Sequence, residues 1–234
     1  MLSIIIPTLN EERFMQPLLK SLVPQLEKGD EIIIVDSHSN DRTVAIARKY
    51  RCRVVSMPRK GIAAAKNKGA RKAKNSIVAF LDADCVVSKR WLEKIKKHFK
   101  TGKFKAVAGL DLYRAHSKKR QSMYNTYSKS LYHAARTFHR LGGKAWLPAN
   151  NCAIEKRLFL KIGGYRNVVC EDAEFMKRFP RTAKVCYDPS MVVRLSDRRF
   201  RQHGFGKTLA LWLVADVKGW MGNGIHAKKY QKIG

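Results

Sequence analysis

The stretch IVAFLDADC, residues 77–85, joins an apolar run to two aspartates, Asp82 and Asp84. The run Ile77–Leu81 predicts a buried strand, and polar residues that directly follow a strand mark the edge at which open α/β sheets bind ligands. Two carboxylates close together repel each other, which raises a pKa unless a cation or a shared proton offsets the charge. The stretch therefore indicates metal binding or acid–base chemistry, and the alternative is a solvated surface pair.

The residues on both sides of this stretch alternate short apolar runs with helical patterns. Further strands are expected at Leu2–Ile6, Ile32–Val35, Val54–Val55 and Ala106–Leu110. Helices are expected at Glu11–Leu26, Thr43–Tyr50, Gly61–Ala73 and Lys89–Lys100. Alternation of this kind predicts an α/β fold with a mainly parallel, Rossmann-like sheet that helices cover on both faces.

The first expected helix has a defined start and a buried stripe. Asn10 is a suitable N-cap, followed by acids that suit the first turn of a helix. Pro17 is expected to kink or delay the helix, because proline lacks a backbone N–H. The stripe recurs every fourth residue and consists of Phe14, Leu18, Leu22 and Leu26.

Longer and less regular segments make up the second half of the chain. Apolar residues at helical spacing predict an amphipathic helix from Ser117 to Leu141 with its stripe toward the core, and Gly142–Gly143 predict its end. The stripe consists of Met123, Tyr127, Leu131, Ala134, Phe138 and Leu141. Two strands are expected farther along, at Val185–Tyr187 and Met191–Leu195.

The chain is strongly basic, with 48 Lys and Arg against 18 Asp and Glu and a formal net charge of +30. Such a charge suits nucleic acid, an anionic membrane surface or a phosphate-rich substrate. The basic residues are spread along the chain and form no zinc-finger, RRM or KH motif. Nucleic acid is therefore not the expected partner.

The five cysteines are odd in number and widely spaced, which indicates reduced thiols rather than a disulfide framework or a zinc site. The amino terminus enters a strand without the layout of a signal peptide. No run of about 18 apolar residues, the length of a membrane span, is present. These features favour a cytoplasmic protein, which can still lie peripherally on the cytoplasmic face of a membrane.

Five strings follow one another between Ser3 and Arg178: SIIIPTLNEE, IIIVDSHSNDRT, GIAAAKNKGA, FLDADC, and GGY with CEDAEFMKR. In this order they resemble the family 2 glycosyltransferases of GT-A fold. The resemblance implies a single α/β domain of two abutting halves. It also implies a nucleotide-sugar substrate, a Mn²⁺ or Mg²⁺ ion, and transfer of the sugar with inversion.

The length of 234 residues fits one such domain with an appended tail. The resemblance implies a domain of residues 1–200, with a nucleotide-binding half at 1–110 and an acceptor-binding half at 111–200, and a helical tail at 201–234. Within the tail, the stretch from Phe205 to Met221 mixes apolar and aromatic residues with lysines. Such a segment docks on the domain or lies in a bilayer interface, and docking is the preferred interpretation.

The resemblance assigns the donor's nucleoside to residues after the first two strands. Pro7, Thr8, Asn10 and Glu11 are expected to contact it from the turn after the first strand. Asp36 ends the second strand and is expected to accept a hydrogen bond from the base. The alternative for Pro7 and Asn10 is a structural role, in which they shape the turn and cap the helix.

Asp82-Ala83-Asp84 is the D-x-D motif of such enzymes. Carboxylates separated by one residue on a turn can face the same site, and hard divalent cations prefer oxygen ligands. By resemblance, Asp84 is the main ligand of Mn²⁺ or Mg²⁺. Asp82 is a second ligand and the partner of the ribose, and the cation neutralises the diphosphate leaving group.

The second acidic pair, Glu171-Asp172, supplies the candidate base. Inversion needs a carboxylate that deprotonates the acceptor hydroxyl. By resemblance, the acidic motif maps onto Glu171, Asp172 and Glu174, with Asp172 as the base. The alternative is that Asp172 caps the start of a helix, where negative charge is favoured.

Three basic positions have less defined roles. Lys66 stands where the family often has arginine, so it can hold a phosphate only as a point charge. Arg198 and Arg199 lie in RLSDRRFRQHG, which resembles a Ser-x-Arg-Arg segment of some members, and they would clamp a diphosphate or an acceptor phosphate. His203 would complete a metal shell, although a surface histidine is the simpler interpretation.

Trp146, Asn150 and Asn151 lie where such enzymes receive the acceptor, and the indole would stack on a sugar ring or fill the core. The expected donor is a UDP- or GDP-sugar, and the expected acceptor is a glycan or a polyprenyl phosphate at an anionic membrane surface. The alternative enzyme is a sugar-nucleotide pyrophosphorylase, but PTLNEE lacks the glycine-rich loop expected of one. The alternative from another class is a non-catalytic binder of nucleic acid or anionic surfaces.

Overall fold

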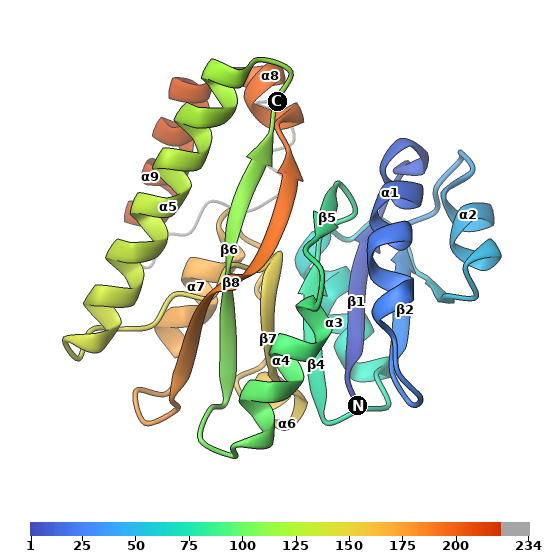
Figure 1. Ribbon diagram of the computed structural model, residues 1–234, viewed down its shortest axis with the longest axis horizontal. Helices are drawn as coiled ribbons and strands as arrows, with labels where there is room; N and C mark the ends of the chain where they lie inside the picture. The colour runs from blue at the N-terminus through green and yellow to red at the C-terminus, as the bar shows by residue number, and fades with distance from the viewer. Residues whose placement is uncertain (221–234) are drawn as a thin grey trace.

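Eight strands form one sheet in the order β3-β2-β1-β4-β7-β6-β8-β5 in the computed structural model, which describes residues 1–220 (Figure 1). The strands are β1 (Ser3–Thr8), β2 (Glu31–Asp36), β3 (Arg53–Ser56), β4 (Ile77–Leu81), β5 (Cys85–Val87), β6 (Ala106–Arg114), β7 (Asn151–Glu155) and β8 (Val185–Ser196). The helices are α1 (Glu12–Leu22), α2 (Thr43–Lys49), α3 (Ile62–Lys72), α4 (Trp91–Lys100), α5 (Lys118–Arg140), α6 (Lys156–Lys161), α7 (Glu171–Arg178), α8 (Arg198–His203) and α9 (Phe205–Trp220).

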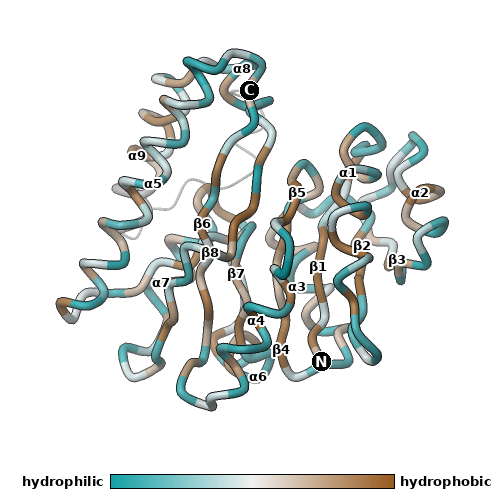
Figure 2. The backbone as a smooth tube through the Cα atoms, in the orientation of Figure 1, coloured by the Kyte–Doolittle hydropathy of each residue, from teal (hydrophilic) through white to brown (hydrophobic). Residues whose placement is uncertain are grey.

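The first half of the sheet is parallel throughout, as the strand–helix alternation predicts. β1 pairs in parallel with β2 and with β4, and β2 pairs in parallel with β3. Along β1, Ile5 packs into a cluster with α3, α6 and α7, whereas Ile4 and Ile6 pack into a second cluster with α1 and α4. The sheet therefore carries a helical layer on each face, and its strands are the most continuously apolar part of the chain (Figure 2).

The second half of the sheet is mixed. β7 is antiparallel to both of its neighbours, β4 and β6, while β6 and β8 are parallel. Because β7 is antiparallel to both neighbours, β6 and β4 run in the same direction. The carboxyl ends of β4 and β6 therefore lie at the same edge of the sheet. The register pairs Leu81 with Asn151, so the residues before β7 lie beside the D-x-D motif.

β8 is one strand of 12 residues, not the two short strands that the sequence predicts. Its register against β6 moves from the pair Gly109–Asp188 to the pair Leu110–Val192, so three residues of β8 form a bulge. The apolar pattern of the sequence is interrupted at this bulge, so the sequence predicts a gap between two strands there.

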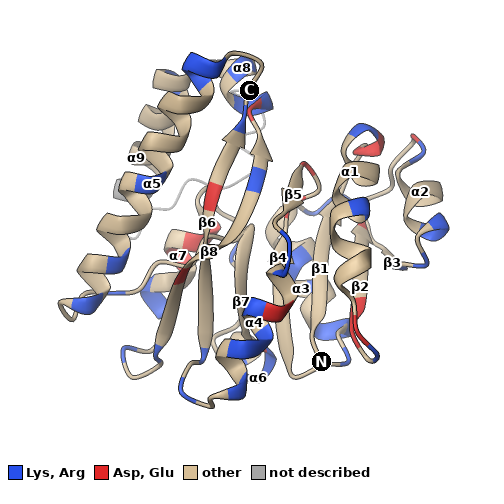
Figure 3. Ribbon diagram, viewed as in Figure 1, with Lys and Arg blue, Asp and Glu red and all other residues tan. Residues whose placement is uncertain are grey.

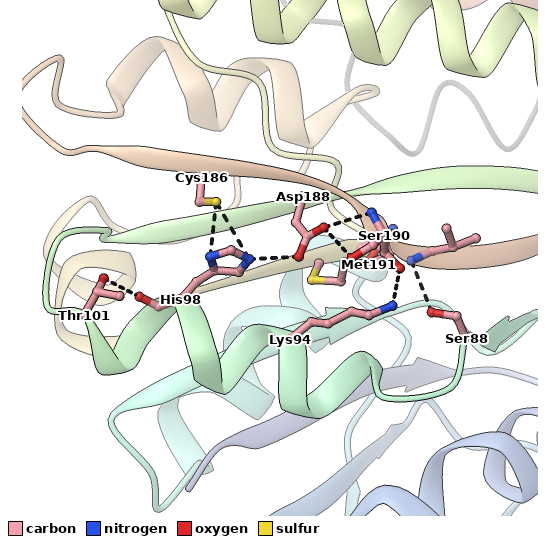
Figure 4. A network of polar contacts seen from close by, with 10 residues as sticks. Ser88, Lys94, His98, Thr101, Cys186, Asp188, Ser190 and Met191 are labelled. Atoms are coloured by element: carbon pink, nitrogen blue, oxygen red, sulfur yellow. Dashed lines mark hydrogen bonds and ion pairs between the residues drawn. The ribbon is translucent and has the colours of Figure 1, made fainter.

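A polar network ties the bulge of β8 to α4 (Figure 4). His98 Nε2 lies 2.8 Å from Asp188 Oδ2, and Ser190 donates to Asp188 Oδ1 from its backbone N–H at 2.8 Å and its hydroxyl at 2.6 Å. Lys94 donates to the Ser190 carbonyl at 2.6 Å. The bulge is therefore a fixed part of the sheet.

The apolar stripe of α5 does not face the core, so that prediction is wrong. Met123, Leu131 and Phe138 are 45%, 41% and 58% exposed, and Leu141, just after the helix, is 82% exposed. The face toward the domain instead carries the buried Tyr124 and Tyr132, with the half-buried Ser128 between them. This face turns inward because its side chains form hydrogen bonds with the backbone of β6. Ser128 donates to the Asp111 carbonyl at 2.5 Å, and Asn125 Oδ1 accepts from the Tyr113 N–H at 2.7 Å.

The first part of α9 docks on the domain, in line with the preferred interpretation. Phe205 packs against Tyr124 with ring centroids 5.0 Å apart, and Trp212 packs against Phe200 at 5.8 Å. Leu213 and Val214 face outward, 66% and 45% exposed. Within residues 1–220 no helix has the length and apolar character to cross a bilayer. The expected tail beyond Trp220, including Met221, lies outside the described residues.

Three details near the amino terminus also differ from expectation. Pro7 and Thr8 belong to β1 itself rather than to the turn that follows it. α1 begins at Glu12 and continues through Pro17, so the proline does not delay it. Asn10 is not the N-cap, because it adopts a left-handed conformation with φ of 56° two residues before the helix.

Candidate active site

The loops after β1 and β2 are joined into one preformed cradle. Asn10 accepts a hydrogen bond from the Asn40 N–H at 2.9 Å and donates its own N–H to Ser39 at 2.9 Å. The Glu11 N–H donates to the Thr43 hydroxyl at 2.8 Å. These contacts account for the unusual backbone of Asn10, since asparagine tolerates the left-handed region better than most residues.

Asp36 is the centre of this cradle. Its side chain is only 4% exposed and accepts from Thr8 Oγ1 at 3.2 Å, from Ser39 Oγ at 2.6 Å and from the Ser39 N–H at 3.0 Å. The carboxylate that the sequence predicts to bind a base therefore also fixes the loop around it. Pro7, Thr8, Asn10, Glu11 and Asp36 all lie together at the carboxyl edge of the sheet.

Lys66 lies in the interior rather than at an open phosphate site. Its ammonium group is 1% exposed and contacts Asp82 Oδ1 at 3.1 Å and Glu171 Oε1 at 3.4 Å. Burial alone would lower the pKa of Lys66, but Asp82 and Glu171 outweigh burial and raise it well above its ordinary value. One buried cation thus joins the D-x-D motif to the acidic pair, residues more than eighty positions apart in the sequence.

Asn67, the residue after Lys66, forms hydrogen bonds with the GGY string and accounts for its glycine. Asn67 Nδ2 donates to the Tyr165 carbonyl at 2.7 Å, and the Tyr165 N–H donates to Asn67 Oδ1 at 2.8 Å. Gly164 has φ of 65°, and a Cβ there would lie 2.3 Å from Asn67 Oδ1. Only glycine allows this close approach, so two motifs brace each other and place α7 next to Lys66.

Asp84 meets a different cation. Arg198, the first residue of α8, forms an ion pair with Asp84, with Nε 2.8 Å from Oδ2, and donates from its two terminal nitrogens to Glu11, both at 2.8 Å. Burial raises the pKa of Asp84 to about 6, even though Arg198 lowers it. Arg199, the next residue, is exposed, and its charge also lowers the pKa of Asp84.

The acidic motif of α7 divides into two functions. Glu171 contacts Lys66, and Asp172 Oδ1 accepts from the Ala173 N–H at 2.9 Å in the first turn. Glu174 points elsewhere, since it forms a bidentate pair with Arg178 at 2.9 and 2.6 Å and contacts Arg166 at 3.2 Å. Glu174 therefore stabilises the helix and is not part of the site.

The acceptor-side residues also divide. Asn151 is fully buried, accepts from Trp91 Nε1 at 3.0 Å and donates to the Met191 carbonyl at 3.1 Å, which makes it a structural residue. Trp146 is half-buried in the loop before β7. Asn150, next to Asn151 in the sequence, donates to Asp111 Oδ2 at 2.9 Å.

Asp111 is the site residue that sequence reasoning misses. It lies in β6, and burial raises its pKa to about 7, although the amides of Asn150 and Asn151 lower it. The amino-acid composition could have pointed to it. Acids are scarce in this chain, so a single carboxylate inside an apolar strand is unusual (Figure 3).

The metal-binding prediction rests on few ligands. Among residues 1–220, no three His, Cys, Asp or Glu side chains converge as a metal cluster, so the structure does not bring His203 into a shell with the aspartates. Two carboxylates nevertheless fit Mg²⁺ or Mn²⁺, because such ions take one or two carboxylates and complete their shell with water and substrate phosphates. Asp84 and Asp82 supply that donor set.

The matches to known proteins identify the family of this chain. A family model described as glycosyl transferase family 2 matches residues 3–163, the region that holds β1 to β7 and the D-x-D motif. The chain belongs to this family. Family 2 membership accounts for the order of the first four motifs, and the acidic motif of α7 follows just beyond the matched region.

Two curated relatives of this family 2 chain are glycosyltransferases. It is 30% identical over 125 residues to the uncharacterized glycosyltransferase EpsJ of Bacillus subtilis, covering 51% of this chain and 36% of the relative. It is 33% identical over 100 residues to the glycosyltransferase AglE of Haloferax volcanii, covering 39% and 33%. The matched parts thus amount to about a third of each relative's length.

Solved structures confirm the GT-A fold of this family 2 chain. The mannosyltransferase PcManGT of Pyrobaculum calidifontis, in complex with GDP-Man and Mn²⁺, has a TM-score of 0.64 and 20% identity, covering 82% of this chain and 56% of that one. S. aureus TarS 1–349, in complex with UDP-GlcNAc, has a TM-score of 0.64 and 19% identity, covering 83% and 58%.

Proposed function

We propose that this protein transfers one sugar from a nucleoside diphosphate sugar to an acceptor hydroxyl or phosphate, with inversion at the anomeric carbon. One observation carries the proposal: Lys66 contacts both Asp82, of the donor motif, and Glu171, next to the candidate base. The donor carboxylates and the base are therefore parts of one site. The UDP-GlcNAc and GDP-Man complexes of the structural neighbours support a nucleotide-sugar donor.

In this proposal Asp172 is the general base. It takes the proton of the acceptor hydroxyl while the acceptor oxygen bonds to the anomeric carbon and the bond from that carbon to the diphosphate oxygen breaks. The first turn of α7 favours its ionised form, since helix amino termini stabilise negative charge. Lys66 contacts the neighbouring Glu171 and Asp82, so the base assigned to Asp172 stands beside two carboxylates that share one cation.

The diphosphate is assigned to the Asp84 side of the site. Asp84 and Asp82 would hold Mn²⁺ or Mg²⁺, and the Mn²⁺ in the PcManGT complex supports this assignment. When bound, the cation neutralises charge on the diphosphate leaving group. Arg198 and Arg199 would contact the same diphosphate, where an arginine fork binds phosphate oxygens well.

The test pairs a binding assay with a transfer assay. Titration with UDP, GDP and their common sugar derivatives, with and without Mn²⁺, identifies the donor, and product formation is then followed for Asp172→Asn. Loss of general-base catalysis should lower kcat by about 10²- to 10⁴-fold, while nucleoside diphosphate affinity stays within about twofold, since the proposal assigns Asp172 to the acceptor rather than to the nucleotide.

Glu174→Gln is the matched control on the same helix. It removes a carboxylate that pairs with Arg178, so it should lower the melting temperature and leave kcat nearly unchanged. Full activity in Asp172→Asn would contradict the assigned base. Binding of an oligonucleotide, without binding of any nucleotide, would contradict the proposed function and favour the non-catalytic binder.

The acceptor is proposed to be lipid-linked and presented at an anionic bilayer. Ten large apolar side chains are exposed within the described part of the chain, and six of them lie on α5, directly after it, or on α9. α5 also carries six Lys or Arg and no acid. An apolar helix face combined with a strong positive charge suits the interface of an anionic membrane.

Vesicle sedimentation tests this surface. The protein should bind vesicles that contain phosphatidylglycerol and should bind pure phosphatidylcholine weakly. The double change Phe138→Ser with Leu141→Ser should reduce binding several-fold, because each exposed apolar side chain contributes area to the interface. Leu160→Ser, on α6, is the control and should bind as before. If the unmodified protein binds neither kind of vesicle and dimerises through α5, the apolar surface is a contact with a second copy of the chain instead.

A further inference from the structure

One carboxylate oxygen of Asp111 has no hydrogen-bond partner among the described residues, although the nearby Asn151 amide favours the charged form of the group. Its Oδ2 accepts from Asn150 at 2.9 Å, but its Oδ1 has less than 1 Å² exposed and no hydrogen-bond partner. A buried, unpaired carboxylate oxygen is costly, and native structures keep few of them without a function. The feature therefore suggests a ligand that donates a hydrogen bond.

The backbone on both sides of this carboxylate is fixed. The Asp111 carbonyl accepts from Ser128 Oγ at 2.5 Å, which anchors the strand to α5. On the other side, a Cβ at Gly109 would lie 2.2 Å from the Met191 carbonyl, so the bulge of β8 packs directly against the backbone of β6. The side chain is thus held in place without help from a bound molecule.

The position within the site identifies the kind of ligand. Asp111 lies in the carboxyl half of β6, on the edge that also carries the end of β4, and the charges of Asp82 and Lys66 both act on it. Those two residues lie between Asp84, assigned to the diphosphate, and the acidic pair of α7, assigned to the acceptor. A donor molecule has its transferred sugar ring between these two points.

We propose that Asp111, together with Asn150, binds hydroxyl groups of the transferred sugar and so selects among donor sugars. This assignment rests on the proposed function. A sugar hydroxyl donates to Asp111 Oδ1, which completes the hydrogen bonding of the carboxylate, while Asn150 holds the other oxygen. A site built to bind a hydroxyl discriminates strongly against a sugar that lacks it or points it elsewhere, because the polar group is then left unpaired.

The experiment compares the nucleoside diphosphate with its sugar derivatives. The unmodified protein, Asp111→Asn and Asp111→Ala are titrated with UDP or GDP, whichever binds, and with a panel of its sugar derivatives that differ in hydroxyl configuration. A hydrogen bond to a charged group contributes about 1.5–3 kcal/mol, so the preferred nucleotide-sugar should bind about 10- to 100-fold more weakly to the variants. The nucleoside diphosphate should bind within about twofold of the unmodified protein.

A second readout separates selection from a structural role. The affinities of the different sugar derivatives should converge in Asp111→Asn, whereas a general loosening of the site would weaken all of them and the nucleoside diphosphate alike. Asp188→Asn, on the neighbouring strand and in contact with His98, is the control for local loosening and should keep the sugar preference.

Three results would overturn the assignment. The first is an equal loss for the nucleoside diphosphate and its sugars, which would make Asp111 a structural residue. The second is unchanged sugar binding with a higher KM for the acceptor. The third is an unmodified protein that binds no nucleotide at all, which overturns the proposed function itself and this assignment with it.

Discussion

The two aspartates of the D-x-D motif meet two very different cations. Asp82 contacts Lys66, whose side chain is 1% exposed on a helix in the middle of the domain. Asp84 contacts Arg198, whose side chain is 42% exposed on a short helix near the end of the chain. The contact distances are similar, 3.1 Å and 2.8 Å, so the surroundings rather than the distances distinguish the two pairs.

This difference in burial makes the Lys66–Asp82 pair a permanent one and the Arg198–Asp84 pair an exchangeable one. Lys66 is almost completely buried and contacts Asp82 and Glu171 at once, so removing it leaves two partly buried carboxylates without compensation. Arg198 is a guanidinium that water reaches, and its partners Asp84 and Glu11 are the groups that a metal and a nucleotide would approach. We expect Lys66 to stay in place during a reaction cycle and Arg198 to exchange with ligands.

The largest effect is expected from Lys66→Met, which keeps the length of the side chain and removes its charge. Breaking a buried ion pair from one side costs about 3–5 kcal/mol, which corresponds to a fall in melting temperature of about 10 °C for a chain of this size. Thermal unfolding measures this fall in melting temperature. Lys72→Met, at an exposed position of the same helix, is the control. An unchanged melting temperature would mean that Lys66 is not a structural cation.

Asp111 extends the comparison to a carboxylate with no cation in contact. Its pKa is raised from 3.8 to about 7, so the folded state binds the proton more tightly than the unfolded state. Stability contributed by this group is therefore greatest at low pH and is lost as the pH rises toward 7. Asp111→Asn should raise the melting temperature by about 3 °C above pH 7 and have little effect near pH 4. Thermal unfolding at both pH values checks the sign, and a destabilised variant at high pH would contradict it.

Arg198→Ala tests the exchangeable pair. A partly exposed ion pair contributes at most about 1 kcal/mol, so the melting temperature should change little. Asp84 would lose its internal competitor, and Mn²⁺ should bind up to about fivefold more tightly in the absence of nucleotide. Calorimetric titration with Mn²⁺ measures this, with Arg201→Ala on the same helix as control. Weaker Mn²⁺ binding would show that Arg198 supports the cation instead.

The smallest effect is expected where an ion pair is short but fully exposed. Arg90 and Glu93 form two contacts of 2.6 Å at the start of α4, on the surface. Water solvates both groups equally well when they separate, so Glu93→Gln should leave the melting temperature unchanged. A marked loss would mean that distance, rather than burial, determines the value of these pairs.

The parallel half of the fold and the acidic motifs could be predicted because each is a local pattern. A strand such as Ile77–Leu81 is apolar along its whole length, and the aspartates follow it directly. The face of α5 could not be predicted, since Tyr124, Ser128 and Tyr132 have the same helical spacing as the apolar stripe. Which face turns inward depends on the hydrogen bonds of β6, a contact that periodicity does not contain.

The surroundings of Lys66 could not be predicted for a related reason. The motif places a cation at that position, but only the packing of α3 against α7 reveals that two carboxylates already surround it. Asp111 was missed because one acid in an apolar strand resembles an exposed edge position. Its burial follows from β7 and β8 on either side, which are brought there by residues far along the chain.

The place of β7 between β4 and β6 also sets the order in which the protein can fold. β4 pairs with β1 on one side, and the strand on its other side, β7, begins at Asn151, 70 residues after β4 ends at Leu81. At about 5–20 residues per second, β4 leaves the ribosome about 4 to 14 seconds before β7 does. During that interval β4 is a bare, apolar sheet edge, the kind of surface that pairs with other chains. A nascent chain of this protein should therefore be a chaperone client until β7 arrives.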